Sequence, residues 1–371
     1  MANAALPGPG ETSAAPDATF TGRARQQLSR MAPANFAMVM GTGIVAVGLA
    51  GQGHPGLATL LCLLCVALWL IHVFLLGGRL LLFPAESLAD LRQPARSSGY
   101  LTLVAGTNVL GSGCALIFHN NAAAHVLFWI GLCLWPCLAC LIWVTLCITD
   151  TKAPLEKGIN GAWLLFTVST QSVVVLAALV WEDAAGAEAG FLLFTAFFLG
   201  ESFYFLLMPL IIYRLMFKPL AASELSATFW INAGAMAITC LAGVRLSAVL
   251  QAAPETAGLV PLTRAMAAGA WGMASFWIPC LILLGVWRHL MRRYAFQYSV
   301  EYWSMVFPLG MYTVCTQALH ALFPYPVLAH LSRVFMLAAL AVWVIVFLSM
   351  CLFLWRHILV GHESPRLPFS S

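Results

Sequence analysis

The chain has 371 residues, of which 61% are hydrophobic and only 9% are charged, and its formal net charge is +4. A soluble globular domain carries about 25% charged residues, so this chain has too few charges to cover a water-facing surface, and we expect no nucleic-acid partner. Residues 97–149 contain no Asp, Glu, Lys or Arg, and since one membrane-spanning helix needs roughly 20 apolar residues, this stretch is long enough for two crossings.

The predicted elements begin with a disordered cytoplasmic tail, residues 1–30. Its first part is mostly Ala, Pro, Gly and Ser, and such a composition cannot bury enough apolar surface to offset the entropy of ordering. The tail lacks the basic segment followed by an apolar core that marks a secretory signal peptide. We therefore expect the first span to act as the insertion signal.

Ten membrane-spanning helices are predicted after the tail, because clusters of Gly, Pro and charge divide the hydrophobic sequence into ten apolar segments. The predicted spans are 31–51, 56–83, 99–118, 123–148, 160–181, 189–217, 226–250, 263–289, 300–322 and 326–356. We expect residues 31–357 to form one all-α transmembrane domain and residues 358–371 to form a short cytoplasmic tail.

Basic residues predict the orientation of these spans. Fifteen of the 18 Lys and Arg residues fall on one side of the membrane, in the tails and connections there or at the span ends beside them. The opposite connections hold Glu182, Asp183, Glu188 and Glu255, with Arg264 as their one base. By the positive-inside rule both termini are cytoplasmic, which requires an even number of spans. We expect a multi-pass protein of the plasma membrane, which in bacteria is the cytoplasmic membrane.

Odd-numbered spans differ in composition from even-numbered spans. Each odd span carries Gly, Ser, Thr, Asn or Gln, whereas even spans such as 123–148 consist mostly of Leu, Ile, Phe, Trp and Cys. Several polar residues share a helical face, for example Asn232 with Thr239 and Gly310 with Thr313, because they lie three, four or seven positions apart. The candidate residues for lining a central path are Thr42, Asn108, Thr170, Asn232, Thr239, Gly310, Thr313 and Gln317.

Two interpretations of this alternation compete. Small residues and hydroxyls also let helices pack tightly and bond across interfaces, so each residue taken alone fits packing. Packing has no reason to follow the odd–even order, however, and the polar odd spans recur five times. We therefore predict that odd spans line a central path and even spans shield it from lipid, in repeated hairpins of about 65 residues.

Two segments carry a family resemblance. MAPANFAMVMGTGIVAVG (31–48) and YWSMVFPLGMYTVCTQAL (302–319) are similar to the first and ninth spans of the tellurite-resistance/C4-dicarboxylate transporter family. That family includes fungal malate permeases, sulfite efflux pumps and plant slow anion channels. The MGTG and FPLGMY motifs resemble its dicarboxylate and sulfite branch more than the plant channels. In the number and order of spans, the resemblance covers residues 30–357.

The resemblance implies a fold of five helical hairpins in a quasi-five-fold arrangement, with the odd helices lining a central pore. It also implies a homotrimer, and a phenylalanine on the ninth helix that blocks the narrowest point. The matching residue here is Phe307. The implied substrates are small anions, either a C4-dicarboxylate such as malate or an oxyanion of the sulfite or tellurite type.

Phe307 is also a candidate gate on physical grounds. The next residue, Pro308, lacks an N–H and would clash with the carbonyl of Ser304, so we expect a helix kink there. An aromatic ring beside the small polar residues of this span, such as Gly310, would plug an otherwise open path. The alternative is an ordinary phenylalanine that faces lipid or a neighbouring helix, as most of the 23 phenylalanines of the chain do.

Three charged residues within spans are candidates for function, because such charges cost about 2.5–3.5 kcal/mol each on insertion scales. Arg245 and Arg333 could attract an anion or bind an oxyanion through paired hydrogen bonds, or extend to the lipid headgroups. Arg245 is the stronger candidate, since its span is one of the polar odd spans. Glu201 could pair with a base, bind a proton for coupled transport or bond a hydroxyl. Its span is peripheral, which favours the structural pair.

No cofactor, metal site or catalytic residue is predicted. The pairs Cys62/Cys65 and Cys137/Cys140 fall within spans and lack His partners, which is typical of buried apolar cysteines rather than metal ligands.

The favoured function is passage of small anions through a pore gated by Phe307, since few fixed charges suit passage better than retention. The alternatives are a proton-coupled dicarboxylate carrier, a membrane-embedded oxidoreductase, and a structural or sensory subunit. The last of these leaves the polar odd spans unexplained.

Overall fold

The computed structural model describes residues 20–181 and 186–360. Outside the described residues lie the ends of both predicted tails and two acidic connection residues, namely residues 1–19 and 361–371, Glu182 and Asp183. The final part of the predicted N-terminal tail forms a helix, α1 (Phe20–Ser29). Throughout the two described ranges the regular structure is helical, with no strand.

A long helix occupies each of the ten ranges predicted as spans. At odd positions lie α2 (Ala37–Gly51), α6 (Leu101–Leu116), α9 (Leu165–Val180), α11 (Ile231–Ala252) and α14 (Trp303–Leu322). At even positions lie α3 (Pro55–Leu82), α7 (Asn121–Ile148), α10 (Ala187–Phe217), α13 (Val260–Val286) and α15 (Pro326–Leu354). Within the described residues, 8 of these helices are long and apolar enough to cross a membrane; α6 and α14, which are rich in Gly, Ser and Thr, are not among them.

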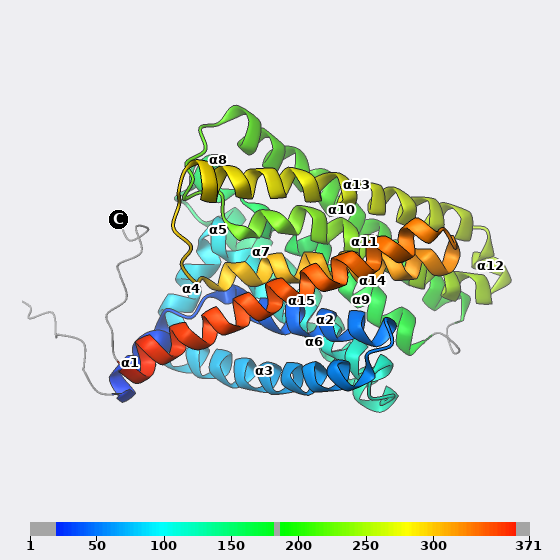
Figure 1. The fold of residues 1–371 in the computed structure, drawn as a ribbon, viewed down its shortest axis with the longest axis horizontal. Coiled ribbons are helices and arrows are strands. Elements are labelled where there is room, and N and C mark those ends of the chain that lie inside the picture. The colour runs from blue at the N-terminus through cyan, green and yellow to red at the C-terminus, as the bar shows by residue number, and fades with distance from the viewer. Residues whose placement is uncertain (1–19, 182–185, 361–371) are drawn as a thin grey trace, which may run out of the picture.

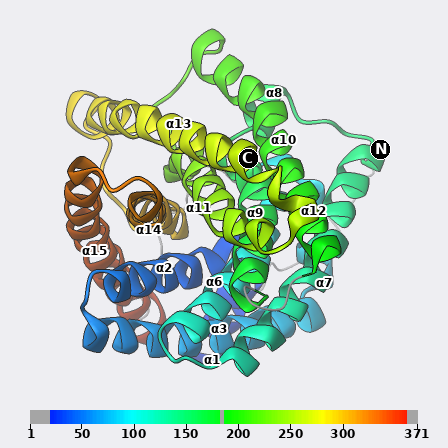
Figure 2. The same ribbon diagram turned by 90° about the vertical axis from the view of Figure 1, so that its right-hand side faces the viewer.

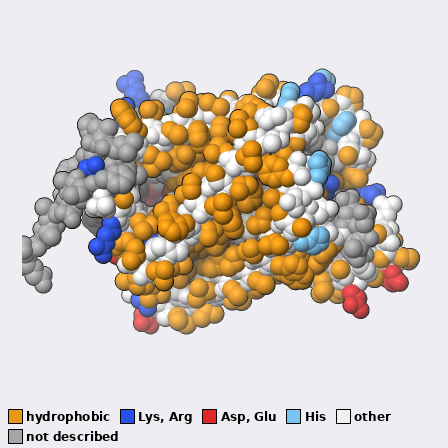
Figure 3. Space-filling view, turned by 90° about the horizontal axis from the view of Figure 1, so that it is seen from below, with side chains coloured by type: hydrophobic (Ala, Val, Ile, Leu, Met, Phe, Trp, Pro, Cys, Tyr) orange, Lys and Arg blue, Asp and Glu red, His pale blue; other side chains and the backbone are white. Residues whose placement is uncertain are grey.

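Figures 1 and 2 together show that the long helices of the odd spans lie inside the bundle and those of the even spans lie outside. The inner helices are thus α2, α6, α9, α11 and α14, and the outer helices are α3, α7, α10, α13 and α15. The candidate spans that contain α2, α9 and α11 are 78–89% buried, whereas the outer helices are only 22–39% buried. The outer helices expose large apolar side chains such as Phe74, Ile148 and Leu337. Figure 3 shows an apolar surface over the middle of the molecule, with charged side chains towards its two ends. An apolar band between polar ends is what a bilayer requires of a protein that spans it.

The inner helices contact one another in a closed ring. α2 packs against α6, α6 against α9, α9 against α11, α11 against α14, and α14 again against α2. Figure 2, viewed along the bundle, shows these five helices around the centre. Each inner helix also packs against the outer helix that follows it in the chain. The bundle is therefore built from consecutive helix pairs, each with one inner and one outer member.

Small residues let the inner helices approach closely. A Cβ on Gly310 of α14 would lie 2.7 Å from Cγ2 of Ile44 on α2. A Cβ on Gly234 of α11 would lie 2.8 Å from Cγ of Pro308 on α14. Both distances are well below the optimal carbon–carbon separation of about 3.5–4.0 Å, so a larger residue at either position would force two inner helices apart. Close packing is thus one cause of the glycine content of the odd spans.

Each inner helix begins with a turn of 3-10 helix, and the five turns contact one another in the same cyclic order. The turns are η1 (Pro33–Phe36), η2 (Ser98–Tyr100), η3 (Gly161–Leu164), η4 (Ala227–Trp230) and η6 (Val300–Tyr302). Polar side chains cap two of them: Asn160 Oδ1 accepts from the Ala162 N–H, and Ser299 Oγ accepts from the Glu301 N–H. The positive ends of five helix dipoles therefore converge at one end of the bundle.

The connections at this same end contain short helices and ion pairs, of which Arg79–Asp90 is buried. The short helices are α4 (Pro84–Arg92), α5 (Pro94–Ser97) and α8 (Leu155–Gly158), while α12 (Pro254–Ala257) lies at the opposite end. Arg79, at the end of α3, bonds Asp90 of α4 at 2.6 Å, and Arg96 of α5 bonds the other carboxylate oxygen at 2.7 Å. These pairs fix the first connection between an outer and an inner helix.

Candidate functional site

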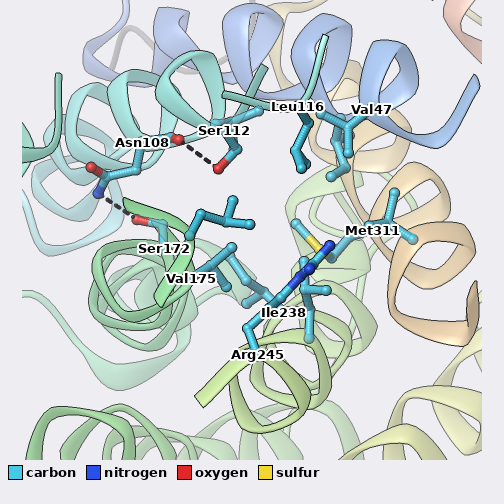
Figure 4. A pocket seen from close by; sticks show the side chains of 14 residues that line it. Val47, Asn108, Ser112, Leu116, Ser172, Val175, Ile238, Arg245 and Met311 are labelled. Atoms are coloured by element: carbon cyan, nitrogen blue, oxygen red, sulfur yellow. Dashed lines mark hydrogen bonds between the residues drawn. The ribbon is translucent and has the colours of Figure 1, made fainter. Parts of the chain in front are cut away.

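A small central cavity is enclosed by side chains from all five inner helices (Figure 4). Its volume of about 20 Å³ is enough for about one water molecule. The polar residues in its wall are Asn108, Ser112, Ser172 and Arg245. The apolar residues in its wall are Ile44, Val47, Val109, Leu116, Val175, Leu179, Ile238, Leu241, Met311 and Val314. The cavity is therefore narrow and mainly apolar, with a few polar groups.

Arg245 is the one charged residue in the described wall of this cavity. It lies on α11 and is half-buried, and Figure 4 shows its guanidinium reaching into the cavity towards Met311. A guanidinium keeps its charge in proteins and presents up to five N–H donors in a planar fork. In this narrow, mainly apolar cavity it is a positive charge, and a guanidinium can bind a carboxylate or an oxyanion through paired hydrogen bonds.

Asn108 borders the cavity through its helix, but its amide group points away from the centre (Figure 4). Its Nδ2 donates a hydrogen bond to Oγ of Ser172 on α9 at 2.9 Å. Its Oδ1 occupies the space beside Gly131 of α7, 2.1 Å from where a Cβ would lie. Asn108 thus joins three helices. Ser112, whose hydroxyl donates to the Asn108 carbonyl at 3.0 Å, also lines the cavity.

Each inner helix carries a buried apolar residue one helical turn from the cavity, and we call these five residues the apolar layer. A residue four positions before a cavity-lining residue lies on the same helical face, one turn or about 6 Å along the axis. Applied to the first cavity-lining residue of each inner helix, this rule gives Met40, Val104, Val168, Gly234 and Phe307, and all five are buried. Phe307 is the largest of the five and is only 2% exposed. The layer lies on the side of the cavity nearer the 3-10 turns.

Pro308 follows Phe307 within α14, and the helix continues through it. Because proline has no N–H, it cannot supply the usual helical hydrogen bond to the Ser304 carbonyl. Its ring packs against Gly234 of α11, so the space for it comes from a glycine on the neighbouring inner helix. The kink at Pro308 stays a prediction.

Four threonines of the inner helices accept hydrogen bonds from tryptophans of the outer helices. The pairs are Trp69–Thr107 (2.9 Å), Trp135–Thr170 (2.9 Å), Trp271–Thr316 (2.9 Å) and Trp343–Thr42 (3.0 Å). Each bond joins an outer helix to the next inner helix around the ring. Thr42 and Thr170, two of the residues predicted to line a path, therefore face outer helices. A buried indole N–H needs an acceptor, and the threonine oxygen supplies it at these four places.

The three predicted lining residues of α14 face α2 and α15. Gln317 Nε2 donates to the Gly48 carbonyl of α2 at 3.3 Å. Ser332 of α15 donates to the Thr313 carbonyl at 3.4 Å. Gly310 is in close contact with α2, as described above. None of the three is among the residues that line the cavity, and that they line a path stays a prediction.

Asn232, one of the two predicted lining residues of α11, lies beside α10. Tyr204 of α10 donates its hydroxyl to the Asn232 carbonyl at 3.4 Å and accepts from Trp277 Nε1 at 2.9 Å. Neither atom of the Asn232 side-chain amide has a hydrogen-bond partner within the described residues. Thr239 is fully buried, and its hydroxyl donates to the Ala235 carbonyl at 2.8 Å.

Arg333 and Glu201 both lie on outer helices, but in opposite environments. Arg333 is exposed on α15 beside Val334, which is 62% exposed, so its side chain can extend to lipid headgroups. Glu201 is only 8% exposed on α10, and its Oε2 has no hydrogen-bond partner. The structural ion pair expected for Glu201 is not formed among the described residues.

Sequence reasoning missed the apolar wall of the cavity and the tryptophan–threonine bonds. The tryptophans could have been singled out from the sequence, because four of the five even spans have one near the middle. The sequence carries no signal for the cavity wall, since the inner helices are buried on nearly all faces and lack an amphipathic pattern. In the part of the chain that the structure describes, no cluster of His, Cys, Asp or Glu is suited to hold a metal ion.

Comparison with known proteins adds an independent finding. Residues 30–351 match the sequence model of a family described as voltage-dependent anion channels. Two uncharacterized transporters of Methanocaldococcus jannaschii are 23% and 22% identical, over 82% and 80% of this chain and 88% and 87% of their own lengths. An uncharacterized membrane protein of Mycobacterium tuberculosis is 35% identical over 147 residues, which is 38% of this chain and 71% of that protein.

Proposed function

Since this chain belongs to the family of voltage-dependent anion channels, we propose that it carries C4-dicarboxylates such as malate, or oxyanions of the sulfite or tellurite type, across a membrane. The observation that carries this proposal is Arg245, the charged residue of a cavity enclosed by all five inner helices. A fixed positive charge in an apolar passage favours anions over cations. Because there is only one such charge in the described wall, the anion can also leave.

The proposed architecture has all ten long helices crossing the membrane as five hairpins around a quasi-five-fold axis, with the odd helices lining the pore. The closed ring of inner-helix contacts and the burial of the odd helices support it. In such a ring α6 and α14 do not meet lipid, so they need not be as apolar as the outer helices. We place both termini in the cytoplasm on the positive-inside rule, in the plasma membrane, and we take the homotrimer from the family resemblance.

In this proposal Phe307 is the gate. It is the largest side chain of the apolar layer, one helical turn from the cavity, and it is almost fully buried. Movement of this ring would connect the cavity to the end of the bundle where the 3-10 turns converge. The path then runs past Asn108 and Arg245, while Thr42 and Thr170 hold the inner helices to the outer ones.

A second candidate function, a proton-coupled dicarboxylate carrier, is favoured by Glu201. An ionisable residue within the membrane is costly and commonly functional, and no ion pair with a described base accounts for this one. A carrier and a channel differ in whether the anion flux follows a proton gradient.

The test is anion flux into proteoliposomes that contain the purified full-length chain. Malate, succinate, sulfite, nitrate and chloride are supplied in turn, with and without a pH gradient. We expect flux of at least one dicarboxylate or oxyanion well above that of protein-free liposomes, and a lower flux for Arg245→Gln. Flux without a gradient supports a channel, and flux that requires the gradient supports the carrier. No flux of any of these anions would contradict the proposed function.

A further inference from the structure

Each outer helix meets the next inner helix around the ring at a contact that we call a joint. The joint between α10 and α11 differs from the other four. At those four joints a tryptophan of the outer helix donates to a threonine of the next inner helix. At the α10–α11 joint the corresponding position is acidic. Trp69, Trp135 and Glu201 each lie 14 residues after the first residue of their helices, which are Pro55, Asn121 and Ala187. Glu201 therefore stands where two other outer helices carry their hydrogen-bonding tryptophan.

Two contacts fix how α10 and α11 lie against each other. A Cβ on Gly243 of α11 would lie 3.2 Å from Cζ of Phe197 on α10. Further along α10, the Tyr204 hydroxyl bonds the Asn232 carbonyl of α11. The later residue of one helix meets the earlier residue of the other, so the two helices are antiparallel.

Glu201 and Thr239 lie between these two contacts. Glu201 is four positions after Phe197 and three before Tyr204, and such spacings put all three residues on one face of α10. Thr239 is four positions before Gly243, on the face of α11 that meets Phe197. The antiparallel register therefore brings Glu201 level with the segment of α11 between Asn232 and Gly243, which contains Thr239.

The polar groups at this joint are buried and incompletely paired. Glu201 is 8% exposed and its Oε2 has no partner, and Asn232 is 0% exposed with both amide atoms unpaired, among the described residues. An ionised carboxylate without a partner in a buried site carries a large desolvation penalty, whereas the neutral acid carries a small one and can also donate a hydrogen bond. The joint is thus built to accept a proton.

We propose that Glu201 is a proton-binding site whose occupancy sets the rate of anion passage. Only the effect on anion passage rests on the proposed function; the proton-binding site does not. When Glu201 is protonated, the carboxyl donates across the joint to α11 and adds no charge. When it releases the proton, a buried negative charge remains on α10. This helix packs against α11, which bears Arg245. That charge opposes the field of the guanidinium and repels an entering anion.

Few other titratable groups face Glu201. α9 and η3, which both pack against α10, carry none. α11 carries Cys240 and Arg245, and α12 carries Glu255 at the far end of α10. On α10 itself, Tyr204 shares the face. Arg245 is the one basic group on these neighbouring elements, so proton binding at Glu201 and anion attraction at Arg245 act on each other through α11.

The test compares wild type with Glu201→Gln, which keeps the shape of the side chain and removes its charge. Malate and nitrate fluxes are measured in proteoliposomes of the full chain at equal pH on both sides, from about pH 5.5 to 8.5. Between one pH unit above the pKa of a group and one below it, its protonated fraction rises about tenfold. We expect the wild-type flux to rise with acidification by up to this factor, and Glu201→Gln to show the high flux at every pH.

A matched control and a second readout separate the possible outcomes. Glu188→Gln changes an exposed carboxylate in the first turn of the same helix and should keep the wild-type pH profile. Infrared spectra of detergent-solubilised protein should show a protonated-carboxyl band that titrates in wild type and is missing in Glu201→Gln. An unchanged pH profile in Glu201→Gln, or no such band in wild type, overturns the proton site. If wild type shows the band but carries no anion, the proton site stands and the proposed function fails.

Discussion

Trp343 of α15 donates a hydrogen bond from Nε1 to Oγ1 of Thr42 on α2, at 3.0 Å and across 301 positions of the chain. The bond joins the last long helix to the first inner helix, so it closes the ring where the two ends of the transmembrane domain meet. The same bond recurs at three other joints. A buried indole–hydroxyl pair is therefore a repeated element of this fold, at a position where each outer helix meets the next inner one.

Replacing Trp343 by Phe should lower the stability of the folded protein by about 0.6 kcal/mol, the average for a hydrogen bond within a membrane protein, with an upper limit of about 1.7 kcal/mol. The substitution removes the N–H donor and leaves the buried Thr42 hydroxyl without it, while most of the ring volume remains. Unfolding in a denaturing detergent, followed by circular dichroism, measures the change. The control is Trp355→Phe, because Trp355 is 54% exposed and should change stability by less than about 0.5 kcal/mol. Equal losses for the two variants would count against a structural role for the bond.

A second stability prediction concerns the buried ion pair at the end of α3. Arg79 and Asp90 have side chains that are 2% and 8% exposed, so Asp90→Asn leaves a buried guanidinium without its counter-charge. Removing one partner of a buried pair typically costs about 3–5 kcal/mol. The matched control is Glu224→Gln, because Glu224 is 39% exposed and its partner Arg214 also donates to the Glu156 and Pro219 carbonyls. We expect the loss for Glu224→Gln, measured in the same unfolding assay, to be clearly smaller.

The sequence predicted the positions of the long helices well, because apolar length and Gly, Pro and charge punctuation are local signals. The predicted range 160–181, for example, matches the 3-10 turn and helix that together cover Gly161–Val180. The odd–even order also predicted which helices are buried. Both signals follow from the surroundings that a whole helix meets, either lipid or other helices.

The sequence could not predict which face of an inner helix borders the cavity. Thr42 and Thr170 carry the polar signal, yet their partners are Trp343 and Trp135 of outer helices. Conversely, Met311 lines the cavity and is an apolar residue like many others in its span. A helix that is buried on all sides has no amphipathic pattern to give its orientation, so the facing residues depend on contacts between segments far apart in the chain.

Replacing Phe307 by Ala should raise anion flux and lower stability together. Truncating a buried phenylalanine typically costs about 3–5 kcal/mol, and here it also opens the apolar layer next to the cavity. Phe128→Ala is the matched control, because Phe128 is 1% exposed on α7 and packs against Trp181 at a ring distance of 4.9 Å, away from the cavity. It should lose similar stability without a gain in flux. Flux is measured in proteoliposomes with equal amounts of folded protein, and an unchanged flux in Phe307→Ala would remove Phe307 from the role of gate.

Replacing Arg245 by Gln should lower anion flux, because the cavity then loses the one charge in its described wall. Focused fields of this kind raise local ion concentration or entry rate by about tenfold or more, so we expect a drop of about tenfold at low substrate concentration. Arg245→Lys should retain part of the flux for chloride, where only charge matters. It should retain less for malate, since an ammonium lacks the planar fork that binds a carboxylate with two hydrogen bonds.

Arg333→Gln supplies the matched control for Arg245, since it removes the same charge from an exposed position on the outer helix α15. Its flux should stay within about twofold of wild type at physiological salt, because an exposed charge more than a Debye length of about 8 Å from the path is largely screened. Raising the salt concentration should therefore change the Arg245 effect less than any residual Arg333 effect. If the two variants lose flux equally, the attraction comes from the overall charge of the protein surface. That result would contradict the proposal that the anion passes through the cavity.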